Sequence, residues 1–329
     1  MIERFLILAR HLVRDPTRLD SPVRTQYFCG MTRALFSLAV VALTLASSGP
    51  YATTSTPVAA PPRGTLLIVG GGPQPPALVK QFVELAGGPG RAKIVVFAQA
   101  SAEGLKSGEE KAVELRALGA DARNIWVTRD EANTDSIAKL LDKATGVWFG
   151  GGDQVRLAKV LRQTKTEAAI HARYEAGAVI GGTSAGAAVM SEVMITGDER
   201  RPGGDRRDTT NAYMTIARDN IVTDTGFALI GSAVIDQHFL RRKRHSRLIS
   251  LVLERAPHLG VGIDESTALI VPPTGPWRVA GASVAVIYDA RGSKTTPTSS
   301  HVLGATNLRM HVLPAGSTFD PQTGKATLP

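Results

Sequence analysis

The sequence predicts an α/β fold, with a doubly wound, mostly parallel β-sheet and a β-rich C-terminal section. Short apolar runs rich in β-branched residues alternate with amphipathic helical patterns from residue 65 to the serine at position 184. Continuously apolar strands are typical of parallel sheets whose two faces are covered by helices. A composition of 43% apolar and 20% charged residues in 329 is that of an ordinary globular protein.

The predicted elements follow one another in regular alternation. Each apolar run is short enough for a strand, and each amphipathic stretch is long enough for a helix of several turns. The predicted strands are 65–72, 92–100, 124–129, 146–153 and 178–182, and the predicted helices are 76–88, 108–120, 136–144, 154–163, 167–177 and one that begins at the serine.

After residue 260 the pattern changes to strands and turns, in the segments 260–271, 277–290 and 300–316. Too few residues remain there for a second independent domain. We therefore predict that residues 63–329 form a single domain with a β-rich end.

The N-terminal region is predicted to be an export signal. An uninterrupted apolar run from Ala34 to Ala46 follows a positive charge and precedes small residues, which is the pattern of a secretory signal peptide. The run is shorter than the roughly 20 residues of a membrane-spanning helix, so a membrane anchor is the weaker alternative. We expect residues 1–50 to be leader and signal peptide, with Met31 as an alternative start and cleavage after Ala46 or Ala52.

Residues 51–62 contain mainly Thr, Ala and Pro without any charge, and this composition predicts an exposed linker. We expect the protein to be secreted or periplasmic, without stable membrane insertion after signal cleavage. The single cysteine, Cys29, precedes the apolar run and would be lost with the signal. Disulfides and thiol catalysis are then excluded for the mature chain.

The chain is basic, with a formal net charge of +9, of which residues 1–50 supply +3 through six arginines and three acidic residues. Such a balance permits binding to nucleic acids or acidic polymers. The sequence contains no recognisable nucleic-acid-binding module, and aromatic residues do not alternate with its basic ones. We therefore expect no nucleic-acid partner.

Two glycine clusters follow predicted strands. The first, at 70–72, begins like a dinucleotide-binding motif, but Pro75 occupies the third glycine position, and a tight turn is the preferred interpretation. The second, at 150–152, lies between a strand and a helix. Because ligands bind at the carboxyl ends of parallel strands, the N–H groups of Gly151 and Gly152 are predicted to donate to an oxyanion.

A Gly-x-Ser-x-Gly pattern surrounds Ser184, between Gly182 and Gly186. In this pattern a sharp turn lifts the serine hydroxyl above the sheet, and it requires the strand before and the helix after that are both predicted here. The N–H of Ala185 at the helix start is a further predicted oxyanion donor. The pattern predicts a nucleophilic serine, with a purely structural turn as the alternative.

A nucleophilic serine needs a base and a carboxylate that orients this base. His238 follows an apolar strand at the sheet edge where Ser184 emerges, and is the predicted base. Asp236, Asp264 and Glu265 are the candidates for the acid. The last two interrupt an apolar run, where acidic residues are costly unless paired. Glu265 is the preferred partner of the histidine, and an exposed turn is the alternative for this pair.

Four motifs in order resemble those of the cyanophycinases, serine hydrolases related to aspartyl dipeptidases. They are GGGDQ at 150–154, GGTSAGA at 181–187, IDQHF at 235–239 and GIDESTA at 262–268. The resemblance extends from about residue 64 to about residue 271. It implies a flavodoxin-like, class I glutamine amidotransferase-like fold for one hydrolase domain at 63–329.

The resemblance also implies the activity and its residues. The triad would be Ser184, His238 and Glu265, in a homodimer. The substrate would be cyanophycin, a poly-aspartate chain with arginine joined to each side chain, which an exopeptidase would cut to β-aspartyl-arginine dipeptides. Guanidinium groups suit the carboxylate-derived groups of such a chain. The implied substrate-binding residues are Gln154, Asp236, Gln237, Arg242, Arg244 and Arg247.

Other interpretations stay open at this point. An aspartyl or isoaspartyl dipeptidase would share the triad, whereas an α/β-hydrolase-type esterase would use His301 after the acid. A non-catalytic protein that binds acidic polymers would use the basic segment 241–247, which is also typical of a solvated turn. No histidine spacing typical of zinc hydrolases occurs, so we expect no metal and no cofactor. The charged, glycine-rich segment 198–208 is expected to be a mobile loop beside the active site.

Overall fold

A computed structural model of the chain describes residues 63–199 and 215–329. The predicted signal peptide (1–50) and linker (51–62) lie outside the described residues, as does most of the predicted loop at 198–208. Among the described helices, none is both long and apolar enough to cross a membrane.

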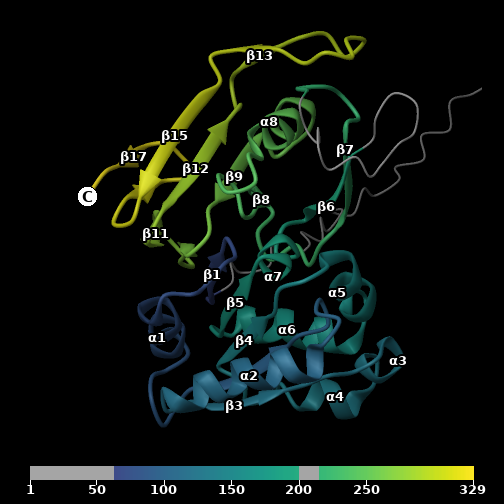
Figure 1. Cartoon of the computed structure of the whole chain (residues 1–329), viewed down its shortest axis with the longest axis vertical. Helices are drawn as coiled ribbons and strands as arrows, with labels where there is room; N and C mark the ends of the chain where they lie inside the picture. The colour runs from purple at the N-terminus through teal and green to yellow at the C-terminus, as the bar shows by residue number, and fades with distance from the viewer. Residues whose placement is uncertain (1–62, 200–214) are drawn as a thin grey trace, which may run out of the picture. The chain divides into compact units, whose positions relative to one another are not determined.

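The main sheet has nine strands within the described ranges, in the order β17-β16-β11-β10-β1-β5-β4-β2-β3 (Figure 1). Its half from β1 to β3 is parallel, which confirms the predicted α/β class. Runs such as LLIV and IVVF are buried along their whole length because helices cover both faces. The parallel strands are β1 (Thr65–Val69), β2 (Lys93–Phe97), β3 (Asp121–Asn124), β4 (Gly146–Phe149) and β5 (Val179–Thr183).

Beyond β1 the sheet continues with antiparallel strands from the C-terminal section, so the predicted β-rich end extends the main sheet. β10 pairs with β1 on the side opposite to β5. β1 therefore lies between the strand that leads to Ser184 and the strand that follows Glu265. The added strands are β10 (Thr267–Val271), β11 (Trp277–Gly281), β16 (Thr318–Phe319) and β17 (Ala326–Thr327).

Helices cover both faces of the parallel half, as predicted. On one face Phe82 and Leu115 are buried against the sheet, and on the other face Leu157 and Ile170 are buried. The first face carries α1 (Pro76–Leu85) and α2 (Gly104–Ala117). The second face carries α3 (Arg129–Ala132), α5 (Gln154–Leu161), α6 (Lys165–Glu175) and α7 (Ala185–Ala188), while α4 (Asp135–Lys139) contacts α6.

A second sheet packs on the same side as α5 and α7. Within the described residues it has four strands in the order β15-β12-β9-β8. Ile235, Val261 and Ile287 belong to the core that this sheet shares with the main sheet, and its other face buries Leu251 of α8. The strands of the second sheet are β8 (Val234–Asp236), β9 (Leu259–Ile263), β12 (Val284–Asp289) and β15 (Arg309–Pro314), and the helix packed on it is α8 (His245–Glu254). Two separate two-stranded sheets are formed by β6 (Val193–Glu199) with β7 (Ile221–Thr225), and by β13 (Lys294–Thr295) with β14 (Ala305–Thr306).

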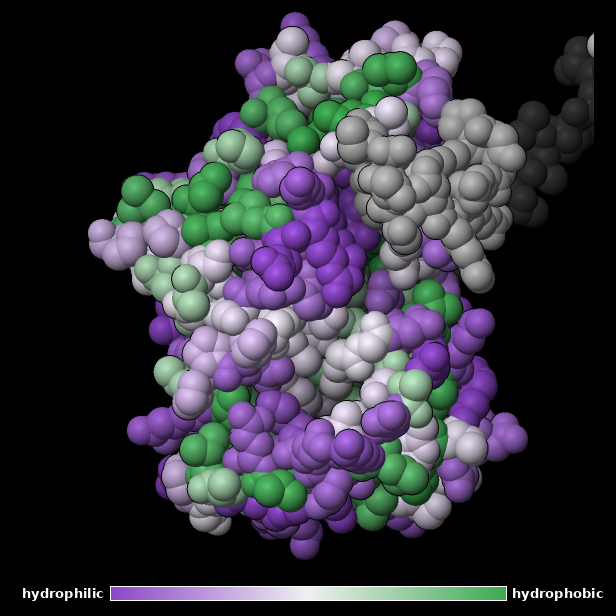
Figure 2. All heavy atoms as spheres, viewed as in Figure 1, coloured by the Kyte–Doolittle hydropathy of each residue, from purple (hydrophilic) through white to green (hydrophobic). Residues whose placement is uncertain are grey.

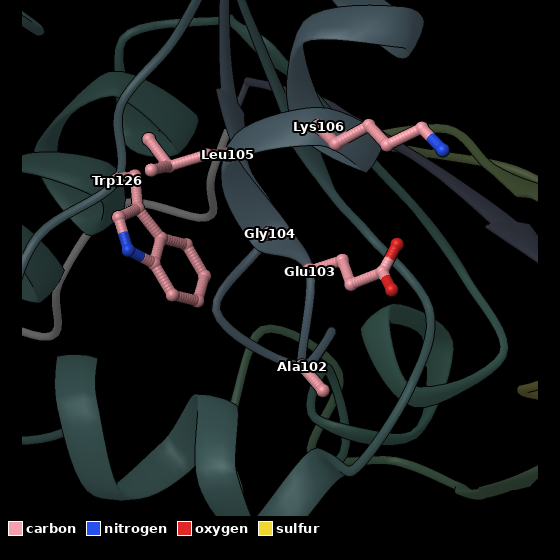
Figure 3. Close-up of a pocket in the computed structure, with 6 residues that line it drawn as sticks. All are labelled: Ala102, Glu103, Gly104, Leu105, Lys106 and Trp126. Carbon is pink, nitrogen blue, oxygen red and sulfur yellow. The ribbon is translucent and has the colours of Figure 1, made fainter.

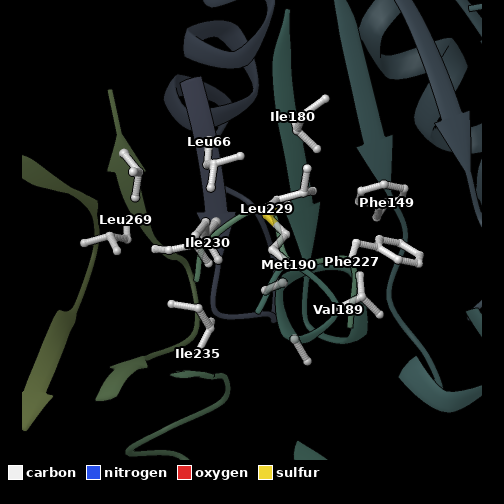
Figure 4. Close-up of a cluster of buried hydrophobic side chains, with 14 of the residues drawn as sticks. Leu66, Phe149, Ile180, Val189, Met190, Phe227, Leu229, Ile230, Ile235 and Leu269 are labelled. Carbon is white, nitrogen blue, oxygen red and sulfur yellow. The ribbon is translucent and has the colours of Figure 1, made fainter. Parts of the chain in front are cut away.

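The shared core includes Ala185 and Ala188 of the helix that directly follows Ser184. Figure 4 shows Ile180 of β5, Leu66 of β1 and Ile235 of β8 around Met190 and Ile230. All five side chains are at most 4% exposed. The turn between β5 and α7 therefore rests on a packed apolar base.

The surface differs in character along the second sheet. In the view of Figure 2, hydrophobic residues gather over β12 and β15, where Met310 and Val312 are exposed. Hydrophilic residues gather beside them, over β8 and β9. In the turn between β8 and α8, Arg241 and Lys243 are exposed, as a solvated basic turn requires.

Three sequence predictions need correction. The strand expected at 124–129 lies earlier, as β3, and the side-chain amide of Asn124 at its end donates to the carbonyls of Gly104 and Leu105. The strands expected on both sides of the acidic pair in 260–271 are present, but they belong to different sheets. The chain crosses between the two sheets at this pair. The strand before His238 was likewise expected in the sheet that carries Ser184, but β8 belongs to the second sheet.

Candidate active site

Ser184 occupies the sharp turn between β5 and α7 that the Gly-x-Ser-x-Gly pattern predicts. Its backbone has φ 55° and ψ −111°, a conformation that residues with a side chain rarely adopt. Gly186 lies so close to β4 that a Cβ atom there would overlap the carbonyl group of Phe149. The small residues of the motif therefore allow this turn to pack against the neighbouring strand.

The serine hydroxyl lies within hydrogen-bond distance of an imidazole. Oγ of Ser184 is 2.9 Å from Nε2 of His238, two residues after β8. The other ring nitrogen, Nδ1, is 2.6 Å from Oε1 of Glu265, between β9 and β10. Three side chains from distant parts of the sequence thus form a continuous chain of hydroxyl, imidazole and carboxylate.

The surroundings of His238 favour its neutral form. Burial lowers the pKa of this imidazole most strongly. The hydrogen bond and charge of Glu265 raise the same pKa, and the positive charges of Arg242 and Arg244 lower it. A neutral ring that donates from Nδ1 to the carboxylate leaves Nε2 able to accept the proton of the serine.

The predicted oxyanion donors lie on two turns beside the serine. Ala185 is the first residue of α7, where N–H groups have no partner within the helix. Gly151 lies close to Ser184, since a Cβ atom there would lie 3.5 Å from Cβ of Ser184. Gly152 lies against the loop after β2, where a Cβ atom would overlap the carbonyl of Ala100.

The other candidate acids have different partners. Oδ1 of Asp264 accepts from the N–H groups of Leu240 and Arg241, both at 3.1 Å, and so holds the turn after His238. Asp236 is bonded by the guanidinium of Arg247, with 2.7 Å from Nε to Oδ2. Glu265 is therefore the candidate acid that the structure places on the imidazole.

The predicted substrate-binding arginines occupy different environments. Arg247 is 1% exposed and pairs with Asp236. Arg244 precedes α8, and its Nη1 donates to the carbonyl of Gln237 at 2.7 Å. Arg242 lies exposed in the turn before α8. Arg242 and Arg244, whose charges lower the pKa of His238, thus both lie before the first residue of α8.

The side-chain amides of the two predicted substrate-binding glutamines also differ in their hydrogen-bond partners. Nε2 of Gln154 donates to the carbonyls of Ile195 and Thr196, each at 2.7 Å, and thereby ties α5 to β6. Gln237 is 5% exposed, and among the described residues its Oε1 has no hydrogen-bond partner. Gln237 has an unused acceptor, whereas the donor group of Gln154 is committed to the main chain.

His301, the base of the esterase alternative, lies exposed between β13 and β14. Its carbonyl accepts from the N–H of Arg218 at 2.8 Å. The imidazole at the serine hydroxyl is that of His238, so the geometry does not favour the esterase order of residues.

Sequence reasoning missed a contact of the first glycine cluster. Gly71 and Gly72 pack against the side chains of His238 and Glu265, respectively. The prediction of a tight turn at 70–72 described the local chain and left its neighbours out. The position of this cluster at the carboxyl end of a parallel strand was the available signal, because the serine turn lies at the same edge.

A pocket of about 440 Å³ lies elsewhere on this edge, at the start of α2. Figure 3 shows the indole of Trp126 beside Leu105, with Gly104 between Trp126 and Glu103. Its lining contains none of the predicted site residues. Across 63–199 and 215–329, no group of His, Cys, Asp and Glu side chains is arranged to hold a metal ion.

Comparison with known proteins places these motifs in a family. The sequence matches peptidase family S51 over residues 66–274. It is 33% identical to a cyanophycinase of Synechococcus elongatus over 64% of this chain and 63% of that protein, less than two thirds of its length. It is also 33% identical to a cyanophycinase of Trichormus variabilis, over 70% of this chain and 76% of that protein. The resemblance predicted from the four motifs is therefore confirmed.

A solved structure supports the fold independently. The crystal structure of a peptidase from an acI-B1 Actinobacterium matches with a TM-score of 0.57 and 20% sequence identity. The match covers 78% of this chain and 97% of that chain. At this identity the similarity concerns the α/β fold.

Proposed function

Because the chain belongs to peptidase family S51, we propose that it is a secreted serine peptidase that degrades cyanophycin to β-aspartyl-arginine dipeptides. The observation that carries the proposal is the hydrogen-bonded chain from Ser184 through His238 to Glu265, at 2.9 and 2.6 Å. A hydroxyl, an imidazole and a carboxylate in this order are the parts of a nucleophilic hydrolase.

In the proposed reaction His238 takes the proton of the Ser184 hydroxyl at Nε2 while the oxygen attacks the scissile carbonyl carbon. Glu265 stabilises the resulting imidazolium through Nδ1–H. The carbonyl oxygen becomes an oxyanion, and the N–H groups of Ala185 and of Gly151 or Gly152 donate to it. The imidazolium then protonates the leaving amine, and an acyl-enzyme remains on the serine.

A water molecule completes the proposed cycle. His238 removes a proton from this water, whose oxygen attacks the acyl carbonyl and reforms the oxyanion. Collapse of the oxyanion releases the acid product, and the proton returns to Oγ of Ser184. The neutral imidazole favoured by burial is the form that both half-reactions require at their start.

The substrate proposal is supported by the two relatives reported above, both of which carry the name cyanophycinase, and by the groups around the imidazole. The guanidinium groups of Arg242 and Arg244 suit a terminal or backbone-derived carboxylate. The buried acceptor Oε1 of Gln237 suits an N–H of the peptide or of its arginyl side chain. Asp236 pairs with Arg247 and accepts a hydrogen bond from the N–H of Gln237 at 2.7 Å, and so holds the main chain of Gln237 in place.

We also propose export through the N-terminal signal, and a homodimer. The support for export is the apolar run from Ala34 to Ala46 with its preceding charge. Expression in a bacterial host, followed by N-terminal sequencing of the extracytoplasmic protein, should give a chain that begins after Ala46 or Ala52. Sedimentation of that product gives its oligomeric state.

The decisive experiment compares substrates. The purified protein is incubated with cyanophycin, with short isoaspartyl peptides and with simple esters, and the products are identified by mass. We expect β-aspartyl-arginine from cyanophycin and its loss in Ser184→Ala. Cleavage of the isoaspartyl peptides alone would instead identify a dipeptidase, and cyanophycin hydrolysis retained by Ser184→Ala would rule out the proposed mechanism.

A further inference from the structure

The turn after β1 contacts each part of the proposed triad through the main chain. Three successive carbonyl groups at residues 69–71 accept hydrogen bonds from three distant segments. The bonds run from the N–H of Ser184 to Val69 (3.1 Å), of His238 to Gly70 (2.6 Å) and of Ser266 to Gly71 (2.9 Å). Since Ser266 directly follows Glu265, one short segment holds the main chain at the nucleophile, the base and the acid.

The three donors share an uncommon backbone conformation. φ is 55° at Ser184, 47° at His238 and 56° at Ser266. Residues with a side chain adopt such positive values rarely, and keep them only where neighbouring structure enforces them. The turn after β1 is the contact that these strained positions have in common.

The side of the turn that faces the triad consists of glycines. A Cβ atom at Gly71 would overlap Cε1 and Nε2 of the His238 imidazole. A Cβ atom at Gly72 would lie 2.9 Å from Cβ of Glu265 and 3.0 Å from its Oε2. Both glycines also have positive φ, 107° and 69°. The imidazole and the carboxylate thus rest on a surface where a side chain does not fit.

We propose that residues 69–72 form a positioning turn, which sets the spacing of the Ser184 hydroxyl, the His238 imidazole and the Glu265 carboxylate. This inference rests on the proposed function, because it concerns the same triad. The turn takes no part in the chemistry. Its carbonyl groups fix the main chain of the triad, and its glycines fix where the imidazole and the carboxylate lie.

Gly71→Ala should separate the imidazole from the serine. The added methyl group must displace the ring edge that carries Nε2, while the groups proposed to bind substrate stay in place. We expect kcat to fall by about 100-fold, the effect of a displacement near 1 Å at a catalytic group, with KM little changed. Labelling of Ser184 by a fluorophosphonate should slow to the same degree.

Gly72→Ala tests the acid side of the turn with a milder change. Its methyl group must move the Glu265 carboxylate by a few tenths of an ångström. Because Glu265 raises the pKa of His238, a displaced carboxylate should lower the apparent pKa on the acidic limb of kcat/KM. A loss of folding stability alone would not move this pKa.

Gly90 and Gly275 are matched controls. Their φ values of 77° and 84° resemble that of Gly72, but a Cβ atom at either would meet open space. Alanine at these positions imposes the same kind of backbone strain without touching the triad. We expect Gly90→Ala and Gly275→Ala to lower the melting temperature and to leave kcat and the labelling rate unchanged.

The experiment measures labelling rate, kcat, KM, pH profile and melting temperature for the wild type and the four variants. Slow labelling of Gly71→Ala and a lowered pKa of Gly72→Ala support the positioning turn. Wild-type rates in Gly71→Ala overturn it. If Gly71→Ala does not fold, an unshifted pH profile of Gly72→Ala overturns it. If Ser184 of the wild type is not labelled, the proposed function itself is contradicted. If the wild type is labelled and the variants react equally fast, only the positioning turn is contradicted.

Discussion

At the scale of single residues, the pKa of His238 depends on groups that act in opposite directions. Burial and the charge of Arg242 lower it, whereas Glu265 raises it. In the proposed reaction only the neutral ring accepts the serine proton, so we expect kcat/KM to fall with decreasing pH around an apparent pKa below the ordinary value of about 6.5. Glu265→Gln should lower this pKa further, and Arg242→Gln should raise it.

The measurement is the pH dependence of kcat/KM for the wild type and both variants across the acidic and neutral range. Lys243→Gln, which removes a neighbouring exposed charge, is the control for a general loss of positive charge. Shifts of the same sign in Glu265→Gln and Arg242→Gln would contradict this account of the imidazole.

Asp236 and Arg247 form a buried ion pair, in which each side chain is 1% exposed. Asp236→Leu leaves a guanidinium without its carboxylate in the interior, and we expect a loss of about 3–5 kcal/mol in the free energy of unfolding. Chemical denaturation measures this loss. The double variant Asp236→Leu with Arg247→Met also removes the buried guanidinium of Arg247, so it should recover part of the stability. A double variant no more stable than the single one would contradict the prediction.

At the scale of elements, Gln154 joins α5 to the pair of strands β6 and β7. Its amide supplies donors to the carbonyls of Ile195 and Thr196. Gln154→Leu leaves both carbonyls without these donors, and each lost partner is expected to cost about 1–3 kcal/mol locally. Hydrogen exchange should become faster in 193–199, while the core strands β1 and β5 keep their protection.

Lys159→Leu is the control for this prediction, because Lys159 lies on the same helix with an exposed side chain. It should leave exchange in β6 unchanged. Equal exchange rates in β6 of the wild type and Gln154→Leu would show that the amide does not hold this strand.

Elements with a strong local pattern were predictable from the sequence. β1, β2, β4 and β5 are short apolar runs, and the serine turn follows from glycines at fixed offsets in 182–186. The strand expected at 124–129 was wrong because Trp126 packs against Gly104 at the start of α2, and Ile125 packs into the core where β3 ends. Local periodicity does not distinguish these two uses of an apolar residue.

The residues of the proposed triad were easier to select from the sequence than the residues that hold them in place. A serine, a histidine and a glutamate can be selected as candidates by their residue type and by their positions at strand ends. The contacts of Gly71 with His238, and of Gln154 with β6, depend on which segments the fold brings together. A glycine run or a glutamine at a helix start does not show which distant segment it will contact, because the long-range pairing of strands and helices determines that contact.

At the scale of the whole domain, the main sheet and the second sheet share one apolar core. Ile287 of β12 is fully buried in this core, and β12 contacts β10 and β11 of the main sheet, so this side chain belongs to the apolar contact between the two sheets. We expect Ile287→Ala to cost about 2–5 kcal/mol and to shift one cooperative unfolding transition, because neither sheet keeps its packed face without the other.

Met310→Ala is the matched control in the same sheet, because Met310 on β15 is 56% exposed and its truncation removes little buried surface. Calorimetry of the wild type and both variants checks the prediction, and far-ultraviolet circular dichroism should give the same midpoint as the heat signal. Separate transitions, with only the smaller one moved by Ile287→Ala, would mean that the second sheet unfolds by itself. His238 and Glu265 adjoin strands of that sheet, whereas Ser184 stands on the main one. A cooperative core therefore holds the two sheets together, and the turn at 69–72 sets the spacing of Ser184 and His238 within this one body.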